Sequence, residues 1–198
     1  DVPSNVLRTM ARPMINHRGS EFQGIMEKMT GEVKKVFKTK GEVFTLTSSG
    51  TGGLEAAVVN FINPGDKVIV ASIGNFGERF CQIAEMYDAD VEFIDFGWGN
   101  AIDPKVIEER LAKDTDHEIM AILCQHNETS TAVVNPIKEV SAARKGHPAL
   151  LIVDTVSGLG AAEFDMDGWN VDVAVAGSQK AFMAPPGLAF IAANERAM

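Results

Sequence analysis

Apolar residues in this chain gather into short continuous runs, which are separated by polar and glycine-containing stretches. Runs rich in valine, isoleucine, leucine and alanine are typical of strands that are buried on both faces of a sheet. The pattern predicts strands at residues 67–71, 119–125, 149–153 and 171–176. Such strands need a layer of helices on each side of the sheet, because neither face is suited to water. A further strand is predicted at 43–47, which is rich in β-branched and aromatic residues.

The stretches between these runs carry helical signals. Apolar residues recur at helical spacing in 54–61 and 80–87. A capping residue followed by proline predicts two further helices, at 103–112 and 135–145. Strands that alternate with helices predict an α/β fold, with a mainly parallel sheet and helices on both faces. The length of 198 residues suits one domain of this kind, and no linker or internal repeat divides it.

Charge and composition exclude several classes of function. The chain has a formal net charge of −9, whereas nucleic acids are bound by clustered lysines and arginines, so we expect no nucleic-acid partner. No apolar run reaches about 18 residues and the first residues show no signal-peptide pattern, so we expect no membrane partner. Cys81 and Cys124 lie within predicted elements and suit buried free thiols. Free thiols fit the reducing cytoplasm, which is the location we expect.

A metal site is not expected from the histidines. They are scattered along the chain without the spacing of metal ligands. We expect each to lie at the surface or behind a functional site: His17, His117, His126 and His147.

Two charged residues stand where predicted strands end. Lys180 follows the strand 171–176 after a Gly-Ser-Gln turn, and Asp154 directly follows the strand 149–153. Open α/β sheets bind ligands at the carboxyl ends of their strands. A lysine there suits a Schiff base, and a carboxylate can keep a pyridine nitrogen protonated, which are the two groups that pyridoxal phosphate needs. Taken singly, each has an ordinary explanation as a surface lysine or a capping aspartate.

A turn rich in glycine and hydroxyl groups supplies a candidate phosphate site. The stretch 48–53 reads Ser-Ser-Gly-Thr-Gly-Gly and joins the strand 43–47 to the helix 54–61. Free backbone N–H groups and the helix dipole make such a turn attractive to anions. Its spacing is neither that of the dinucleotide fingerprint nor that of a P-loop. A serine-capped helix with a flexible entry would explain the same residues without any ligand.

Two further loops offer contacts for an aromatic ring. Phe76 lies between Gly74 and Gly77, just past the strand 67–71, where it could stack on a pyridine ring or act only as a hydrophobic staple at a helix start. The polar cluster at 126–131 follows the next long strand and is dense in hydroxyl groups. One of these hydroxyls could bond the phenolate oxygen of the ring.

Together these segments resemble the class V aminotransferases, in particular the alanine–glyoxylate and serine–pyruvate aminotransferase group. The resemblance runs over essentially the whole chain, and the motifs follow the order of the family. They are Ser49-Gly50-Thr51, Asn75-Phe76-Gly77-Glu78-Arg79, the cluster 126–131, the stretch 153–160 and Gly177-Ser178-Gln179-Lys180-Ala181.

The resemblance implies a fold type I large domain over residues 1–198 and pyridoxal 5'-phosphate as cofactor. It makes Lys180 the residue that bonds the cofactor covalently and Asp154 the partner of the ring nitrogen. Thr129 would lie near the ring oxygen, with Phe76 stacked on the ring. The remaining contacts would be Val156 on the other ring face, and Ser49, Gly50, Thr51 and Gln179 around the phosphate.

The reaction implied is the transfer of an amino group from alanine or serine to glyoxylate or pyruvate. The resemblance also implies a homodimer with a shared active site, whose interface lies near residues 15–22. The family has a small C-terminal domain with an arginine that holds the substrate carboxylate, and we expect that domain and the family's N-terminal start to lie outside residues 1–198.

Three other functions stay open. The chain could bind the cofactor without turnover, or it could be a nucleotide-binding domain. It could also be a lyase similar to cysteine desulfurases, although these typically carry histidine where this chain has Gln179 and Phe76. Within the aminotransferases, the position of Phe76 is often tryptophan or tyrosine.

Overall fold

Six of the seven strands of the central sheet point the same way. In the computed structural model, which describes residues 1–198, the strands lie in the order β1-β9-β8-β7-β4-β2-β3, and only β9 runs antiparallel to its neighbours. The mainly parallel sheet predicted from the sequence is therefore confirmed. The strands are β1 (Glu42–Ser48), β2 (Lys67–Ser72), β3 (Asp90–Asp95), β4 (Ile119–Gln125), β7 (Leu150–Asp154), β8 (Val173–Gly177) and β9 (Gly187–Ala193).

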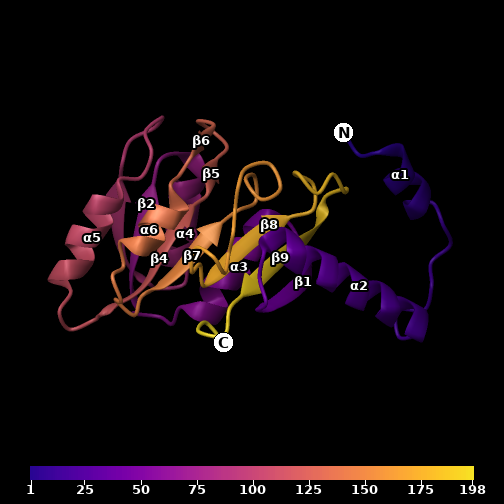
Figure 1. Cartoon of the computed structure of the whole chain (residues 1–198), viewed down its shortest axis with the longest axis horizontal. Helices are drawn as coiled ribbons and strands as arrows, with labels where there is room; N and C mark the ends of the chain where they lie inside the picture. The colour runs from indigo at the N-terminus through magenta and orange to yellow at the C-terminus, as the bar shows by residue number, and fades with distance from the viewer.

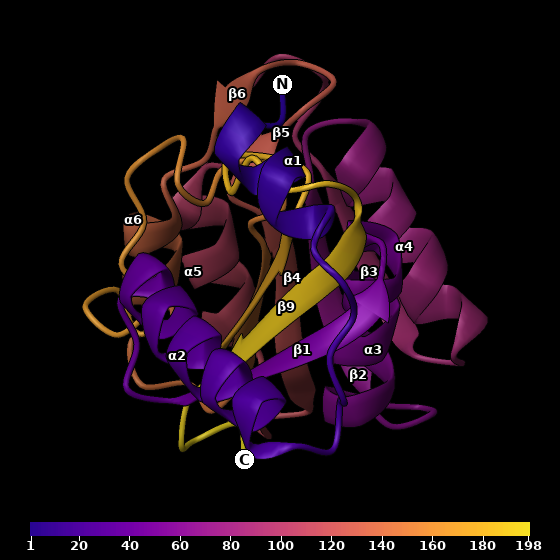
Figure 2. The same ribbon diagram turned by 90° about the vertical axis from the view of Figure 1, so that its right-hand side faces the viewer.

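Helices cover both faces of this sheet (Figure 2). On one face α3 (Gly50–Phe61) and α4 (Asn75–Met86) bury their apolar sides. On the other face lie α2 (Ser20–Phe37), α5 (Pro104–Lys113) and α6 (Ile137–Ala142). The strand β2 contributes to both layers, because Val68 and Val70 belong to the first core and Ile69 and Ala71 to the second.

The N-terminal segment contributes little to the core. The short helix α1 (Ser4–Met10) has no buried residue, and it stands apart from the sheet in Figure 1. Of the 18 residues of α2, only Val33 and Phe37 are buried. Met14, in the segment between α1 and α2, is 99% exposed. Residues 4–14, which we call the apolar arm, are therefore held by few contacts within the chain.

Most boundaries match the sequence prediction, and the differences have local causes. The helix expected over 135–145 ends at Ala142, because Lys145 and Gly146 adopt positive φ angles of 46° and 88° that break the helix. The sequence did not predict β3, an edge strand that is half exposed. It also did not predict a short hairpin formed by β5 (Asn127–Glu128) and β6 (Val133–Val134).

Both cysteines lie in the core of the protein. Cys81 and Cys124 are buried free thiols, as predicted. Burial raises the pKa of Cys124 to about 12 and that of Cys81 to about 11, so both behave as inert core residues. No helix is long and apolar enough to cross a bilayer.

Candidate active site

The sheet brings all the segments singled out in the sequence to one edge. Because β1, β2, β4, β7 and β8 point the same way, their carboxyl ends lie together. The turn after β1 carries Ser49, the helix that follows β2 carries Phe76 in its first turn, and the hairpin after β4 carries Thr129. Asp154 ends β7, and Lys180 follows the neighbouring strand β8. Open parallel sheets bind their ligands at this edge.

Lys180 lies in the tight connection between β8 and β9. The buried Ser178 closes this connection, since its hydroxyl donates to the carbonyl oxygen of Pro185 at 2.6 Å and its N–H donates to the carbonyl oxygen of Leu188 at 2.9 Å. The side chain of Lys180 is exposed and forms no salt bridge, so its amine is accessible at the edge. The sequence pattern predicted Lys180 as a site residue but gave no sign of the structural role of Ser178.

Asp154 is a buried carboxylate with one oxygen left open. It is 5% exposed, and its Oδ1 accepts the N–H of Val156 at 2.8 Å. The other oxygen accepts no hydrogen bond from the protein. Burial raises the pKa of Asp154 to about 6, and the Glu128 carboxylate adds to this, while the Val156 N–H, Arg79 and Lys180 act against it. A buried anion with an open oxygen is suited to a cationic N–H donor.

The turn before α3 offers free backbone donors. The Ser49 hydroxyl accepts the N–H of Gly52 at 3.2 Å and so caps the helix, whereas the N–H groups of Gly50 and Thr51 have no partner. A β-carbon on Gly50 would lie 2.8 Å from Val156, so the turn packs directly against the residue that follows the Asp154 loop. The turn before α3 and the loop after Asp154 are thus in contact.

The ring of Phe76 is connected to the turn before α3 through Arg79. It is half-buried at the start of α4, and the guanidinium carbon of Arg79 lies 4.8 Å from its ring centroid. Arg79 also donates to the hydroxyl of Thr51 at 3.3 Å. One cationic side chain therefore links the ring to the turn before α3, a connection that the sequence pattern did not predict.

The hairpin after β4 holds a buried acid that the sequence pattern marked only as part of a polar cluster. Glu128 is 0% exposed, and its carboxylate accepts hydrogen bonds from Gln125, Ser130 and the first turn of α4. Burial acts to raise the pKa of Glu128, but these hydrogen bonds outweigh it and leave the pKa below its usual value. The sequence held one sign of this role: the residue before α4 is Gly74, which has no side chain to cap the helix, so the cap had to come from elsewhere.

Two of the predicted site residues are placed at the edge without fixed partners. Thr129 and Gln179 are both exposed, and neither side chain forms a hydrogen bond within the protein. Their functional groups are thus free to meet a ligand.

The histidines do not all lie where the sequence led us to expect. His126 is 1% exposed and packs against Phe164 and Trp169, with ring centroids at 5.2 and 6.3 Å. Gly158 lies against it so closely that a β-carbon there would meet the ring at 2.3 Å. His147 is also buried and contacts Asp114 at 3.2 Å. These two are core residues, and no three potential metal ligands come together.

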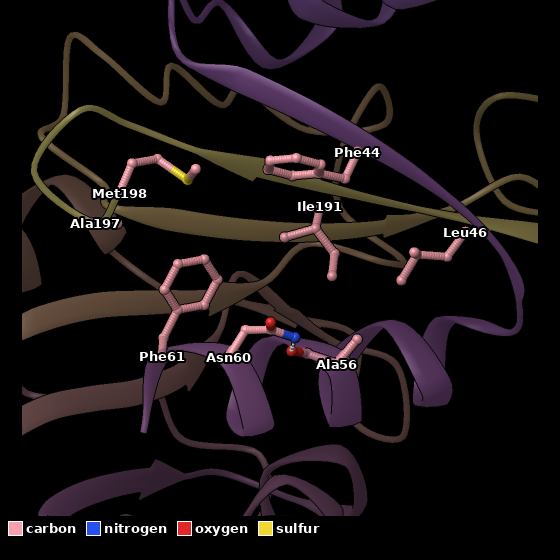
Figure 3. Close-up of a pocket in the computed structure, with 8 residues that line it drawn as sticks. All are labelled: Phe44, Leu46, Ala56, Asn60, Phe61, Ile191, Ala197 and Met198. Carbon is pink, nitrogen blue, oxygen red and sulfur yellow. Dashed lines mark hydrogen bonds between the residues drawn. The ribbon is translucent and has the colours of Figure 1, made fainter. Parts of the chain in front are cut away.

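A separate apolar groove of about 350 Å³ lies away from this edge (Figure 3). It is formed by the last turns of α3, the start of β1, the strand β9 and the chain's last residues. Its walls carry no ionisable side chain, so it offers no group for acid–base or covalent chemistry. It is lined by Phe44, Leu46, Ala56, Asn60, Phe61, Ile191, Ala197 and Met198.

The chain is similar to known proteins over essentially its whole length. The family model for class V aminotransferases matches residues 3–198. An L-aspartate–glyoxylate aminotransferase of Paracoccus denitrificans is 42% identical over 201 residues, which cover 100% of this chain and 51% of the relative. A serine–glyoxylate aminotransferase of Methylorubrum extorquens is 40% identical over 201 residues, covering 100% of this chain and 50% of the relative.

The fold is shared with a solved member of the same group. The crystal structure of ureidoglycine–glyoxylate aminotransferase from Bacillus subtilis matches with a TM-score of 0.95 and 33% identity, over 100% of this chain and 50% of that one. The chain spans about half the length of the curated relatives it matches. The chain therefore belongs to the class V aminotransferases, a family of pyridoxal-phosphate-dependent enzymes.

Proposed function

We propose that this chain is the cofactor-binding large domain of a transaminase that moves an amino group from alanine or serine to glyoxylate or pyruvate. One observation carries the proposal. The accessible amine of Lys180 follows β8, and the buried, half-open carboxylate of Asp154 ends the parallel neighbour β7, beside the free N–H groups that begin α3. An amine, an anion and an anion-binding turn at one sheet edge match the aldehyde, the ring nitrogen and the phosphate of pyridoxal phosphate.

The residues present fit this cofactor. The open oxygen of Asp154 would accept the protonated ring nitrogen, and the free N–H groups of Gly50 and Thr51 would meet the phosphate. Gly50 also lets this turn pack directly against Val156, because a β-carbon on Gly50 would lie 2.8 Å from a Val156 methyl group. The other proposed contacts are Lys180 for the covalent link, Phe76 and Val156 for the two ring faces, Thr129 for the ring oxygen, and Ser49 and Gln179 for the phosphate.

The side chains of this domain would do three jobs in the reaction. When bound, pyridoxal phosphate supplies an electron sink for the α-carbon of the amino acid. The Lys180 amine would remove the proton from the α-carbon of the amino acid and later give that proton up, acting as base and then as acid. The Asp154 carboxylate would keep the ring nitrogen protonated, since a buried anion strongly favours an adjacent cation. Phe76 and Val156 would hold the ring flat between them.

The similarity to glyoxylate aminotransferases supports glyoxylate as the acceptor. The relatives named above use aspartate or serine as donors by their names, so aspartate is a donor to test beside alanine and serine. The desulfurase-like alternative is disfavoured by Gln179 and Phe76, where that class typically carries histidine. Cofactor binding without turnover stays the alternative for residues 1–198 by themselves.

We also propose a homodimer with a shared active site. The exposed apolar arm supports this, because Leu7, Met10 and Met14 are 52%, 60% and 99% exposed and have no core of their own. Residues 15–22 run from the arm into the first turn of α2 and would lie near the interface. Sedimentation at low micromolar concentration tests this proposal, and a well-folded monomer would contradict it.

The function is tested by adding pyridoxal phosphate to the purified protein. We expect a new absorbance band that borohydride fixes, with the cofactor mass found on the peptide containing Lys180. Alanine, serine and aspartate are then added one at a time to the loaded protein, and pyridoxamine phosphate is measured. No band excludes the cofactor, whereas a band without pyridoxamine phosphate for any donor favours binding without turnover.

A further inference from the structure

Helix α4 begins without a capping side chain of its own. The residue before it is Gly74, which has no side chain, and the first N–H groups of the helix cannot reach a partner inside the helix. These groups belong to Asn75, Phe76 and Gly77. Because Phe76 is one of them, whatever caps this helix also places the aromatic ring of the site.

The missing cap comes from the hairpin loop after β4, more than 50 residues along the chain. Glu128 Oε2 accepts the N–H of Phe76 at 3.0 Å and that of Gly77 at 3.2 Å. The Ser130 hydroxyl accepts the N–H of Asn75 at 3.2 Å and donates to Glu128 Oε1 at 2.6 Å. Two side chains of one loop thus satisfy all three free N–H groups of α4.

The contact is so close that it depends on glycine. A β-carbon on Gly74 would lie 2.7 Å from the Ser130 hydroxyl and 2.8 Å from Cγ of Glu128. A β-carbon on Gly77 would lie 2.2 Å from the side-chain nitrogen of Gln125, which also donates to Glu128. The start of α4 and the hairpin therefore form one tightly packed unit with a buried carboxylate at its centre.

We propose that Glu128 is a positioning residue for the cofactor. Its carboxylate joins the helix that carries Phe76 to the hairpin that carries Thr129, so it sets the distance between the ring-stacking and ring-oxygen contacts. This inference rests on the proposed function. Glu128 would act through these elements and not by direct contact, because its oxygens are directed to the N–H groups and side chains that surround them.

Glu128 accepts all of its hydrogen bonds and donates none, so the position requires a charged carboxylate. Every partner of Glu128 donates, including the N–H of Ser130 at 3.0 Å and the side chain of Gln125 at 3.1 Å. A glutamine at this position would turn an amide NH₂ toward N–H donors on one side. Phe76 and Thr129 would then move apart, although the volume of the side chain is unchanged.

The test compares Glu128→Gln with a matched variant far from the site. Asp114 is 8% exposed and its carboxylate also accepts two backbone N–H groups, those of Glu118 at 3.1 Å and Ile119 at 2.7 Å, at the opposite end of β4. Asp114→Asn likewise removes a buried charge that accepts backbone N–H groups, here those that lead into β4. Urea unfolding of the cofactor-free protein and the dissociation constant for pyridoxal phosphate are measured for both variants.

We expect both variants to lose stability, but only Glu128→Gln to bind pyridoxal phosphate more weakly, by about tenfold, the scale of one charge-assisted hydrogen bond. Equal affinity in Glu128→Gln and the unaltered chain would overturn the inference and leave Glu128 as a helix cap. If the unaltered chain binds no pyridoxal phosphate, the proposed function fails as well. The first result rejects only the role of Glu128, whereas the second also rejects the cofactor.

A second variant covers the case in which Glu128→Gln does not fold. Ser130→Ala removes one bond to Glu128 and one to the start of α4, and leaves the buried charge in place. We expect a loss of affinity of about threefold in this variant, less than that expected of Glu128→Gln. Unchanged affinity in Ser130→Ala would again overturn the inference.

Discussion

Gly50 and Val156 approach so closely that no β-carbon fits between them. A β-carbon on Gly50 would lie 2.8 Å from one methyl group of Val156 and 2.9 Å from the other. Gly50 begins the helix α3, and Val156 donates its N–H to Asp154. The anion-binding turn and the loop of the buried carboxylate are therefore packed against each other.

Gly50→Ala should weaken both folding and cofactor binding. The added methyl group must push apart two loops of the site, which costs about 1–3 kcal/mol in a well-packed region. The matched control is Gly24→Ala in α2, where a β-carbon meets no atom within 4 Å and should stabilise the helix by up to about 1 kcal/mol. Urea unfolding and pyridoxal phosphate titration measure both effects. Similar results for the two variants would contradict the close packing.

Lys180→Ala should abolish the covalent attachment of pyridoxal phosphate and all transamination. The side chain is exposed and unpaired, so stability should change by no more than about 0.5 kcal/mol. Lys105→Ala on the surface of α5 serves as control and should retain both properties. Mass spectrometry after borohydride reduction locates the cofactor. Cofactor mass on any other lysine would refute the assignment.

Asp154→Asn should stabilise the cofactor-free protein at pH 8 and have little effect on its stability near pH 4. Burial raises the pKa of Asp154 to about 6 from 3.8, so the folded chain holds this proton more tightly than the unfolded chain. The stability of the unaltered protein should therefore fall as pH rises from about 4 to 6, by about 3 kcal/mol from this group. Asparagine has no proton to lose, so the fall should vanish in urea unfolding.

The same change should impair function. Asparagine can still accept the N–H of Val156, but it lacks the charge that keeps a pyridine nitrogen protonated. We expect pyridoxal phosphate to bind and α-proton exchange of the amino acid to fall strongly. Asp116→Asn, an exposed aspartate after α5, should change neither measurement. Exchange at the normal rate in Asp154→Asn would place the partner of the ring nitrogen elsewhere.

Phe76→Ala should weaken binding of pyridoxal phosphate by about 0.5–1.5 kcal/mol beyond the loss of contact area, the usual contribution of an aromatic pair. Phe93→Ala on the edge strand β3 is the control, since Phe93 is 43% exposed and distant from the site. Affinity is measured by titration and stability by thermal unfolding. If Phe76 were only a hydrophobic staple, thermal stability would fall while affinity stayed intact.

The local pattern of the sequence determined the layers of the fold and which residues are candidates for the site. Continuous apolar runs predicted β2, β4, β7 and β8, because strands buried on both faces need apolar residues at nearly every position. Lys180 and Asp154 were named because each stands where such a run ends. The edge strand β1 was predicted instead from its β-branched and aromatic residues. With these strands parallel, their carboxyl ends had to share one edge.

Only the tertiary structure decided which side chains hold that edge together. Glu128 caps a helix that begins 53 residues earlier in the chain, and Ser178 closes the turn of Lys180 through Pro185 and Leu188. The burial of His126 against Phe164 and Trp169 is of the same kind. A hydrogen bond or a packing contact between distant residues leaves no periodic trace along the chain, because it depends on where the strands place the two loops in space.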